Sequence, residues 1–322
     1  MRYKNTPIPH KEARLSPCEA FGNNTGNFLR KTNTALCGIG VYSTAYFFLD
    51  KSAFSIHNYS IYNRKGFLLM KKTVKLISLG AVTLAVTLCT VTAIKKRSLK
   101  TATYTLPEDF TVTAHTGCEG TADNSLDSIR SGAAAGADIV EIDLHFLPDG
   151  TPLLKHDEPK ESEAGTLPTL EEAFELLSTL DVKMNVDVKS TANIPAVAAL
   201  AEKHGVTDKI FFTGVDENSV AAVKSGASDI PYYLNVDINK RKNTDPDYIS
   251  SVIAKITDSN AIGLNAKFSK CSKELIDAVK GKGLSVSLWT ANKKSEMYRC
   301  LALEPDNITT RNPSELLSLA DR

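Results

Sequence analysis

Strand-like and helix-like patterns alternate along the chain from about Thr103 to the C-terminus. Short apolar runs predict strands at 111–115, 139–144, 183–188, 209–213, 231–236, 261–265, 284–289 and 306–309, with a hairpin strand at 152–155. Helical patterns fall between them at 124–136, 169–179, 193–204, 216–225, 246–258, 272–281, 293–303 and 313–320. Eight strand–helix units in ~220 residues is the count of a (β/α)8 barrel, so residues 101–322 are predicted to form an α/β TIM barrel. An open doubly wound sheet is the alternative, but no glycine-rich phosphate loop follows the first strand.

The composition is that of a globular protein with one large core. The chain has 322 residues, of which 42% are hydrophobic, and a net charge of +1. Nothing in this balance suggests a surface for a polyanion, so nucleic acid is not an expected partner. The cysteines of the predicted barrel, Cys118, Cys271 and Cys300, show no zinc spacing and are expected to be free or buried, with one disulfide possible.

A basic-flanked apolar segment precedes the predicted barrel. Nineteen residues from Leu76 to Ile94 carry no charge, and lysines or arginines stand on both sides. This length just spans a bilayer as a helix, so residues 70–100 are predicted to be a single-pass membrane anchor. The barrel is then expected at the cell membrane, outside the cytoplasm. The alternative is a cleaved signal peptide and a secreted protein.

Residues 1–69 show neither helical nor strand periodicity and are rich in Asn, Ser, Thr and Tyr. Met70, followed by two lysines and the apolar run, resembles a natural start. We therefore expect the first 69 residues to come from a gene start placed too far upstream. The alternative is a disordered tail.

Acidic side chains stand where predicted strands end. Glu141 and Asp143 are two residues apart on one strand, so their side chains point to the same face and can converge on one cation. Asp187, on the neighbouring strand, is the expected third ligand. Oxygen ligands suit a hard ion, so one divalent cation, Mg²⁺ or Ca²⁺, is the predicted cofactor. The alternative is an ordinary solvated acidic pair.

Two histidines follow the same pattern. His115 ends the first strand and His156 ends the hairpin strand, where the rim of a parallel barrel carries its chemistry. An imidazole accepts and donates a proton near neutral pH, so the pair is predicted to act as base and acid on a phosphodiester. Lys189 shares the face of Asp187 and is expected to neutralise a phosphate oxygen, unless it is simply solvated. Trp289 either caps the core or forms a wall of the substrate pocket.

The order of these motifs resembles the glycerophosphodiester phosphodiesterase family of the phospholipase C-like barrel superfamily. The matching segments are His115–Gly117 for its HRG box, Asp123–Asn124 for its EN pair, Glu141–Asp143 for E-x-D, His156–Asp157 for HD, Asp187–Lys189 for E-x-K and Trp289–Asn292 for W-T-x-N. The resemblance covers about residue 110 to the C-terminus. It implies a TIM barrel, a divalent cation and hydrolysis of glycerophosphodiesters, with Trp289 as the pocket wall.

The chain departs from the family pattern at the phosphate contact. Thr116 stands where the HRG box has an arginine, and a hydroxyl cannot supply a bidentate charged contact. Arg311 follows the last strand, which in a closed barrel lies beside the first, so Arg311 is predicted to restore the contact. The alternative is a solvent-exposed arginine capping a loop. Asp123 is expected to orient the His115 loop rather than to bind metal.

Several functions stay open at this point. The first is metal-dependent hydrolysis of small or lipid-derived phosphodiesters to a glycerol phosphate and an alcohol. The others are phospholipase D-like action on lysophospholipids and a degenerate barrel that binds a phosphodiester without turnover. The presence of both histidines and all three carboxylates favours an enzyme. The alcohol, the choice between Mg²⁺ and Ca²⁺ and the oligomeric state stay open.

Overall fold

The structure is a computed structural model that describes residues 81, 83–92, 94 and 104–322. The residues described between 81 and 94 are helical. Residues 1–69, and most of the predicted anchor at 70–100, lie outside the described part of the chain. Within the part that is described, no helix is both long enough and apolar enough to cross a membrane.

Nine strands and eight α-helices follow one another between residues 111 and 319 of the described chain. The strands are β1 (Thr111–Ala114), β2 (Ile139–Phe146), β3 (Pro152–Leu154), β4 (Lys183–Val188), β5 (Ile210–Val215), β6 (Tyr232–Asn235), β7 (Gly263–Lys267), β8 (Ser285–Trp289) and β9 (Asn307–Thr310). The helices are α2 (Leu126–Ala134), α3 (Leu170–Ser178), α4 (Ile194–Lys203), α5 (Val220–Gly226), α6 (Pro246–Ser259), α7 (Lys273–Lys280), α8 (Lys294–Leu301) and α9 (Pro313–Leu319).

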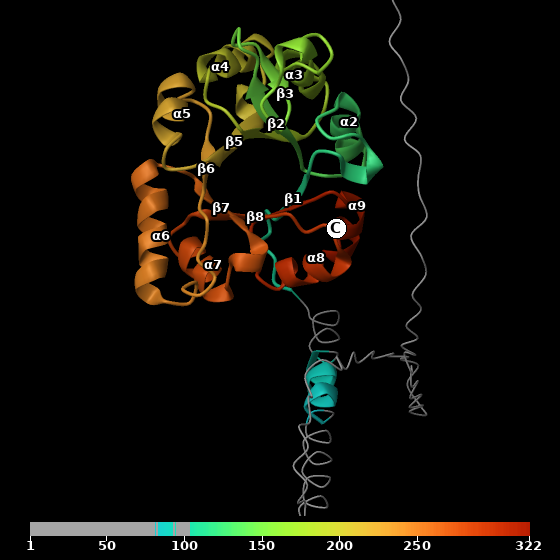
Figure 1. Ribbon diagram of the computed structural model, residues 1–322, viewed down its shortest axis with the longest axis vertical. Helices are drawn as coiled ribbons and strands as arrows, with labels where there is room; N and C mark the ends of the chain where they lie inside the picture. The colour runs from blue at the N-terminus through green and yellow to red at the C-terminus, as the bar shows by residue number, and fades with distance from the viewer. Residues whose placement is uncertain (1–80, 82, 93, 95–103) are drawn as a thin grey trace, which may run out of the picture. The chain divides into compact units, whose positions relative to one another are not determined.

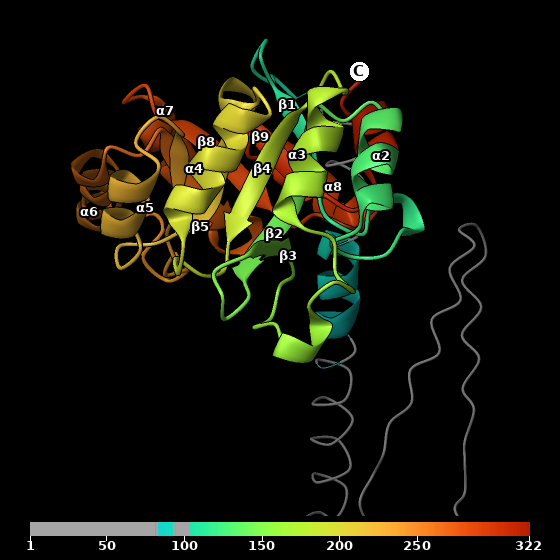
Figure 2. The same ribbon diagram turned by 90° about the horizontal axis from the view of Figure 1, so that it is seen from above.

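The strands close into a barrel. The sheet order is β1-β9-β8-β7-β6-β5-β4-β2-β3, and β1 also pairs with β2, which closes the ring. All pairs are parallel except β2 with β3, the predicted hairpin. Figure 1 shows the strands as an inner ring with the helices outside it, and Figure 2 shows α3 and α4 flanking β4. The predicted TIM barrel is confirmed, and the open doubly wound sheet is wrong.

The two faces of the barrel strands differ in chemistry. One alternating set is apolar and joins the buried core shared with the helices, for example Val140, Ile142, Val186 and Leu264. The other set faces the barrel interior and is mostly polar, with buried Thr113, Glu141, Asn185, Thr213, Asn265, Ser287 and Asn307. Hydrogen bonds satisfy this interior layer, such as Thr213 Oγ1 to Asn185 Oδ1 at 2.8 Å and Asn265 Nδ2 to Asn235 Oδ1 at 2.8 Å. The hydrophobic core therefore lies between strands and helices, and the interior is left to polar groups.

The cysteines form no disulfide in the described part of the chain. Cys118 and Cys300 are buried, Cys271 is partly buried, and all three are free. Burial raises the pKa of the Cys118 thiol and raises the pKa of the Cys271 thiol to about 12. These thiols are therefore poor nucleophiles.

Candidate active site

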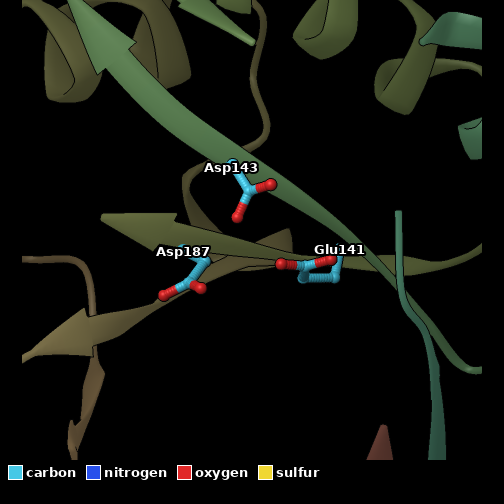
Figure 3. A group of neighbouring side chains, drawn as sticks. All are labelled: Glu141, Asp143 and Asp187. Carbon is cyan, nitrogen blue, oxygen red and sulfur yellow. The ribbon is translucent and has the colours of Figure 1, made fainter. Parts of the chain in front are cut away.

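The three predicted acidic residues meet at the carboxyl end of β2 and β4. Asp143 pairs with Asp187 in the strand register, and Glu141 lies two residues before Asp143 on the same face. One carboxylate oxygen from each lies within 4.8 Å of the others. Figure 3 shows the three side chains turned toward one another from the two strands. Glu141 and Asp143 are buried, and Asp187 is partly buried.

The three carboxylates carry more negative charge than the nearby lysine can balance. Burial, together with the charges of Asp143 and Asp187, raises the pKa of Glu141 well above its usual value. Lys189 Nζ lies 2.6 Å from Asp187 Oδ2 and 3.1 Å from Asp143 Oδ1. Burial lowers the pKa of this amine, but the two carboxylates outweigh burial and hold it above its usual value. With all three acids ionised, one lysine leaves two negative charges unbalanced. The donor set therefore fits a divalent ion that prefers oxygen, such as Mg²⁺ or Ca²⁺.

Hydrogen bonds hold the carboxylates in place. The Thr116 amide donates to Glu141 Oε2 at 2.8 Å, and Thr213 Oγ1 lies 3.2 Å from Asp187 Oδ1. Asn124 makes two bonds to Asp143: its Nδ2 donates to Oδ2 at 2.8 Å, and its Oδ1 accepts from the amide at 2.9 Å. Sequence reasoning assigned no role to Asn124. Its place beside Asp123 in the EN-like pair was the available signal.

His115 directly follows β1 and faces the carboxylates. Its Nδ1 lies 2.9 Å from the Thr116 carbonyl and 3.8 Å from Glu141 Oε2. Arg311 Nε is also 3.4 Å from this Nδ1, but Nδ1 cannot donate to the carbonyl and accept from arginine at once. We assign the proton to the shorter contact, which leaves Nε2 as the acceptor.

His156 follows β3 on the exposed rim. Its Nδ1 lies 2.8 Å from Asp157 Oδ1. Hydrogen bonding to His156 lowers the pKa of the Asp157 carboxyl, which therefore stays ionised near neutral pH. Both histidines line one cavity of about 570 Å³ with the three carboxylates, Lys189, Trp289 and Arg311.

Arg311 and Thr116 take different positions. Thr116 is 1% exposed, and its Oγ1 accepts a hydrogen bond from the Asn124 amide, so the hydroxyl supports the loop instead of facing the cavity. Arg311 follows β9, which pairs with β1, and lines the cavity. One guanidinium nitrogen lies 2.8 Å from Asp123 Oδ1. Asp123 thus pairs with Arg311, which itself lies against His115, and it is not part of the carboxylate cluster.

Trp289 ends β8 and lines the same cavity. Its Nε1 is the one side-chain nitrogen or oxygen in the described chain that is fully closed off from solvent and has no hydrogen-bond partner. His145 and His204 lie apart from the cavity: His145 contacts the amide of Phe146, and His204 contacts Glu171.

Comparisons with known proteins show the family to which the chain belongs. The Glycerophosphoryl diester phosphodiesterase family matches residues 113–162 and 158–315, well over half of the chain. A protein of Caldanaerobacter subterraneus subsp. tengcongensis named glycerophosphodiester phosphodiesterase is 22% identical over 245 residues, which are 65% of this chain and 96% of that protein.

Solved structures share the barrel. One is a putative glycerophosphoryl diester phosphodiesterase from Silicibacter pomeroyi, with a TM-score of 0.57, 17% identity and coverage of 70% of this chain and 96% of that chain. Another is an Oleispira antarctica phosphodiesterase in complex with the product sn-glycerol-3-phosphate, with a TM-score of 0.55, 22% identity and coverage of 67% and 98%. At these identities the structures show the fold. The family match shows the membership: this chain is a phosphoric diester hydrolase of the glycerophosphoryl diester phosphodiesterase family.

Proposed function

We propose that this protein hydrolyses glycerophosphodiesters to a glycerol phosphate and an alcohol, with one bound Mg²⁺ or Ca²⁺ and a histidine pair for proton transfer. The observation that carries the proposal is the convergence of His115, His156 and the three carboxylates on one cavity. An acid–base pair and a cation site together are the equipment for moving protons while charge builds on a phosphoryl group.

His115 is the proposed base. Its Nδ1 donates to the Thr116 carbonyl, so Nε2 is free to take the proton of the attacking hydroxyl. His156 is the proposed acid. Asp157 beside its Nδ1 stabilises the imidazolium form, which then donates a proton from Nε2 to the leaving alkoxide. A divalent cation held by Glu141, Asp143 and Asp187 would draw negative charge from the phosphoryl oxygens.

Arg311 is the proposed phosphate contact. Thr116 is buried in its loop, whereas the Arg311 guanidinium stands at the cavity beside His115. Asp123 holds one end of the guanidinium, which leaves the other nitrogens for phosphate. Lys189, already among the carboxylates, adds a second positive charge on the phosphate side, and Trp289 is the proposed wall for the glycerol or alcohol.

Glycerol phosphate as the product has support from the Oleispira structure, which holds sn-glycerol-3-phosphate in the same fold. The test is a turnover assay of the full chain with a panel of glycerophosphodiesters and lysophospholipids, with added Mg²⁺, added Ca²⁺, or EDTA. Cation-dependent release of glycerol phosphate is the expected result. His115→Ala and His156→Ala should each reduce kcat about 10²-fold, because each removes a proton-transfer step.

The same assay separates the alternatives. Release of the alcohol from lysophospholipids alone would favour phospholipase D-like action. Binding of a diester without turnover in every condition would favour a degenerate binding barrel, the alternative that Thr116 suggests. Near-normal kcat in either histidine variant would remove that histidine from proton transfer.

We also propose that residues 70–100 anchor the protein in the cell membrane with the barrel outside the cytoplasm. The support is the uncharged run from Leu76 to Ile94 between basic residues. Fractionation of cells that make the full chain tests this. Recovery of the protein in the wash after high-salt treatment of membranes contradicts an anchor, and an N-terminus that begins after residue 94 supports the cleaved signal.

A further inference from the structure

A second cavity of about 850 Å³ opens beside the one that holds the histidines and carboxylates. The two share Gly214, Asn235, Asn265 and Trp289 in their linings. The second is otherwise lined by residues of β7, α6 and the segments that follow β5, β6 and β7. In the closed ring β7 lies four strands from β2, so this cavity extends the site toward the side opposite the catalytic carboxylates. A diester whose phosphate lies at the carboxylates can place its larger substituent here.

Amide groups at the junction of the two cavities are free to bind a ligand. Asn265 is 5% exposed, and its Nδ2 donates to Asn235 Oδ1 at 2.8 Å. Neither Asn265 Oδ1 nor Asn235 Nδ2 has a hydrogen-bond partner in the described structure, and neither is sealed from the cavities. The junction therefore offers one acceptor and one donor to hydroxyl groups.

Most charges around the second cavity are already paired. Lys255 Nζ lies 2.7 Å from Glu217, and Lys270 pairs with Asp237. Asp216 accepts hydrogen bonds from the amides of Asn218 and Ser219, so its carboxylate caps its own turn. Lys267 differs from these residues, because it forms no ion pair with any side chain that the structure describes.

Lys267 also lies next to the junction of the two cavities, because its strand neighbour Trp289 lines both of them. It ends β7 in register with Trp289 of β8, and it falls on the same strand face as Asn265. An anionic group on the substituent would lie beside an unpaired ammonium, while the phosphate stays near Arg311. A neutral or cationic substituent would gain nothing from Lys267.

We infer that the second cavity holds the alcohol of the diester and that Lys267 selects alcohols that carry a phosphate or carboxylate group. This inference depends on the proposed function. Because Lys267 is exposed and its charge is screened, the expected preference is modest, about three- to tenfold in kcat/KM.

Two substrate pairs test the inference with the full chain, each differing by one anionic group. The first pair is glycerophosphoglycerol and the same diester with a terminal phosphate. The second is glycerophosphoethanolamine and glycerophosphoserine, which adds a carboxylate. We expect higher kcat/KM for the anionic member, a preference that shrinks at high salt. Lys267→Gln should abolish the preference, and Lys267→Arg should keep it. If Lys267→Gln abolishes the preference in only one substrate pair, the anionic group of that pair is the one that Lys267 recognises.

Lys282→Gln is the matched control. Lys282 is exposed and precedes β8 at the opposite end of the barrel, so its removal should leave both ratios unchanged. Equal ratios in the unaltered protein and Lys267→Gln overturn the inference. Calorimetric measurement of the binding of the same diesters distinguishes failure of this inference from failure of the proposed function. Preferred binding without hydrolysis contradicts the function alone, and binding without preference contradicts the role of Lys267.

Discussion

Gly214 sets how closely β5 approaches the carboxylate of Asp187. Its φ of +74° lies in the left-handed region that glycine favours, and the β5–β6 register is irregular around it. A Cβ built here would lie 2.4 Å from Asp187 Oδ1 and 2.4 Å from the Val188 carbonyl oxygen. No real Cβ tolerates such contacts, so any side chain must push the proposed cation ligand aside.

Gly214→Ala is therefore expected to weaken cation binding as well as folding. Left-handed backbone and the close contact should together lower the free energy of unfolding by about 1–3 kcal/mol. Urea unfolding and calorimetric titration with Mg²⁺ or Ca²⁺ measure the two effects. Gly165→Ala is the matched control, because Gly165 has the same φ of +74° and nothing within 4 Å of an added Cβ. Equal cation affinity in both variants would contradict a positioning role for Gly214.

Arg311→Ala should reduce the stabilisation of the transition state more than substitution of a surface arginine does. Loss of one charged hydrogen bond to phosphate corresponds to about 1.5–3 kcal/mol, or roughly 10- to 150-fold in kcat/KM. Arg311→Lys should recover part of this, since charge remains without the bidentate geometry. Arg130, an exposed residue of α2 paired with Asp127, supplies the control Arg130→Ala. A kcat/KM within twofold of the unaltered protein would leave Arg311 as a loop residue.

At the scale of elements, the sequence patterns predicted which segments form strands and helices. They missed the helix boundaries that side-chain hydrogen bonds shift. Strand β4 has the bounds expected from its apolar alternation. Helix α2 was expected from 124, but it begins after its cap Ser125, because Asn124 has a φ of +53° and turns its amide to Asp143. Helix α5 was expected from 216, but the side chain of Asp216 closes a turn first. Hydrogen bonds to distant or non-helical partners decided these boundaries, and periodicity does not report them.

One ion pair ties the residue before β2 to the last residue of the chain. Asp138 precedes β2, and its Oδ2 accepts from the Val112 amide at 2.8 Å. Arg322 adds two bonds to the same carboxylate, at 2.8 and 2.9 Å. Burial alone raises the pKa of Asp138, but these bonds outweigh burial and hold the pKa below its usual value.

The sign of the pH dependence follows from this lowered pKa. The pair stabilises the fold above the unfolded-state pKa of about 3.9, and that contribution is lost as the pH falls through the lower folded-state pKa. Asp138→Asn should lower the free energy of unfolding by about 1 kcal/mol at pH 7, discounted for partial exposure. The difference should shrink toward pH 3 in urea unfolding. Asp127→Asn is the control, because Asp127 belongs to an exposed ion pair on α2. If Asp138→Asn lowers the free energy of unfolding equally at every pH, the charge argument is wrong.

At the scale of the barrel, the pairing of β9 with β1 brings residues from the two ends of the sequence together in the candidate active site. Arg311 and His115 are 196 positions apart and meet only because β9 pairs with β1. The sequence predicted this neighbourhood from the strand count. It could not predict that Thr116 faces the loop, that Asn124 holds Asp143, or that a second cavity adjoins Trp289. These depend on side-chain directions that the register alone leaves free.

If the carboxylate cluster binds a cation as proposed, cation binding would also stabilise the whole barrel. A ligand that binds only the folded state stabilises it, by about 2.7 kcal/mol at a concentration 100 times Kd. Thermal unfolding of the full chain should therefore shift upward when Mg²⁺ or Ca²⁺ replaces EDTA, and Asp143→Asn should remove most of the shift. In EDTA, where no cation is bound, Asp143→Asn is not expected to lower the stability of the barrel. Asp143 adds a negative charge beside buried Glu141, so the neutral amide should leave the barrel as stable as before or more stable. A variant that is destabilised in EDTA yet keeps the full cation shift would mean that Asp143 supports the fold and not the cation.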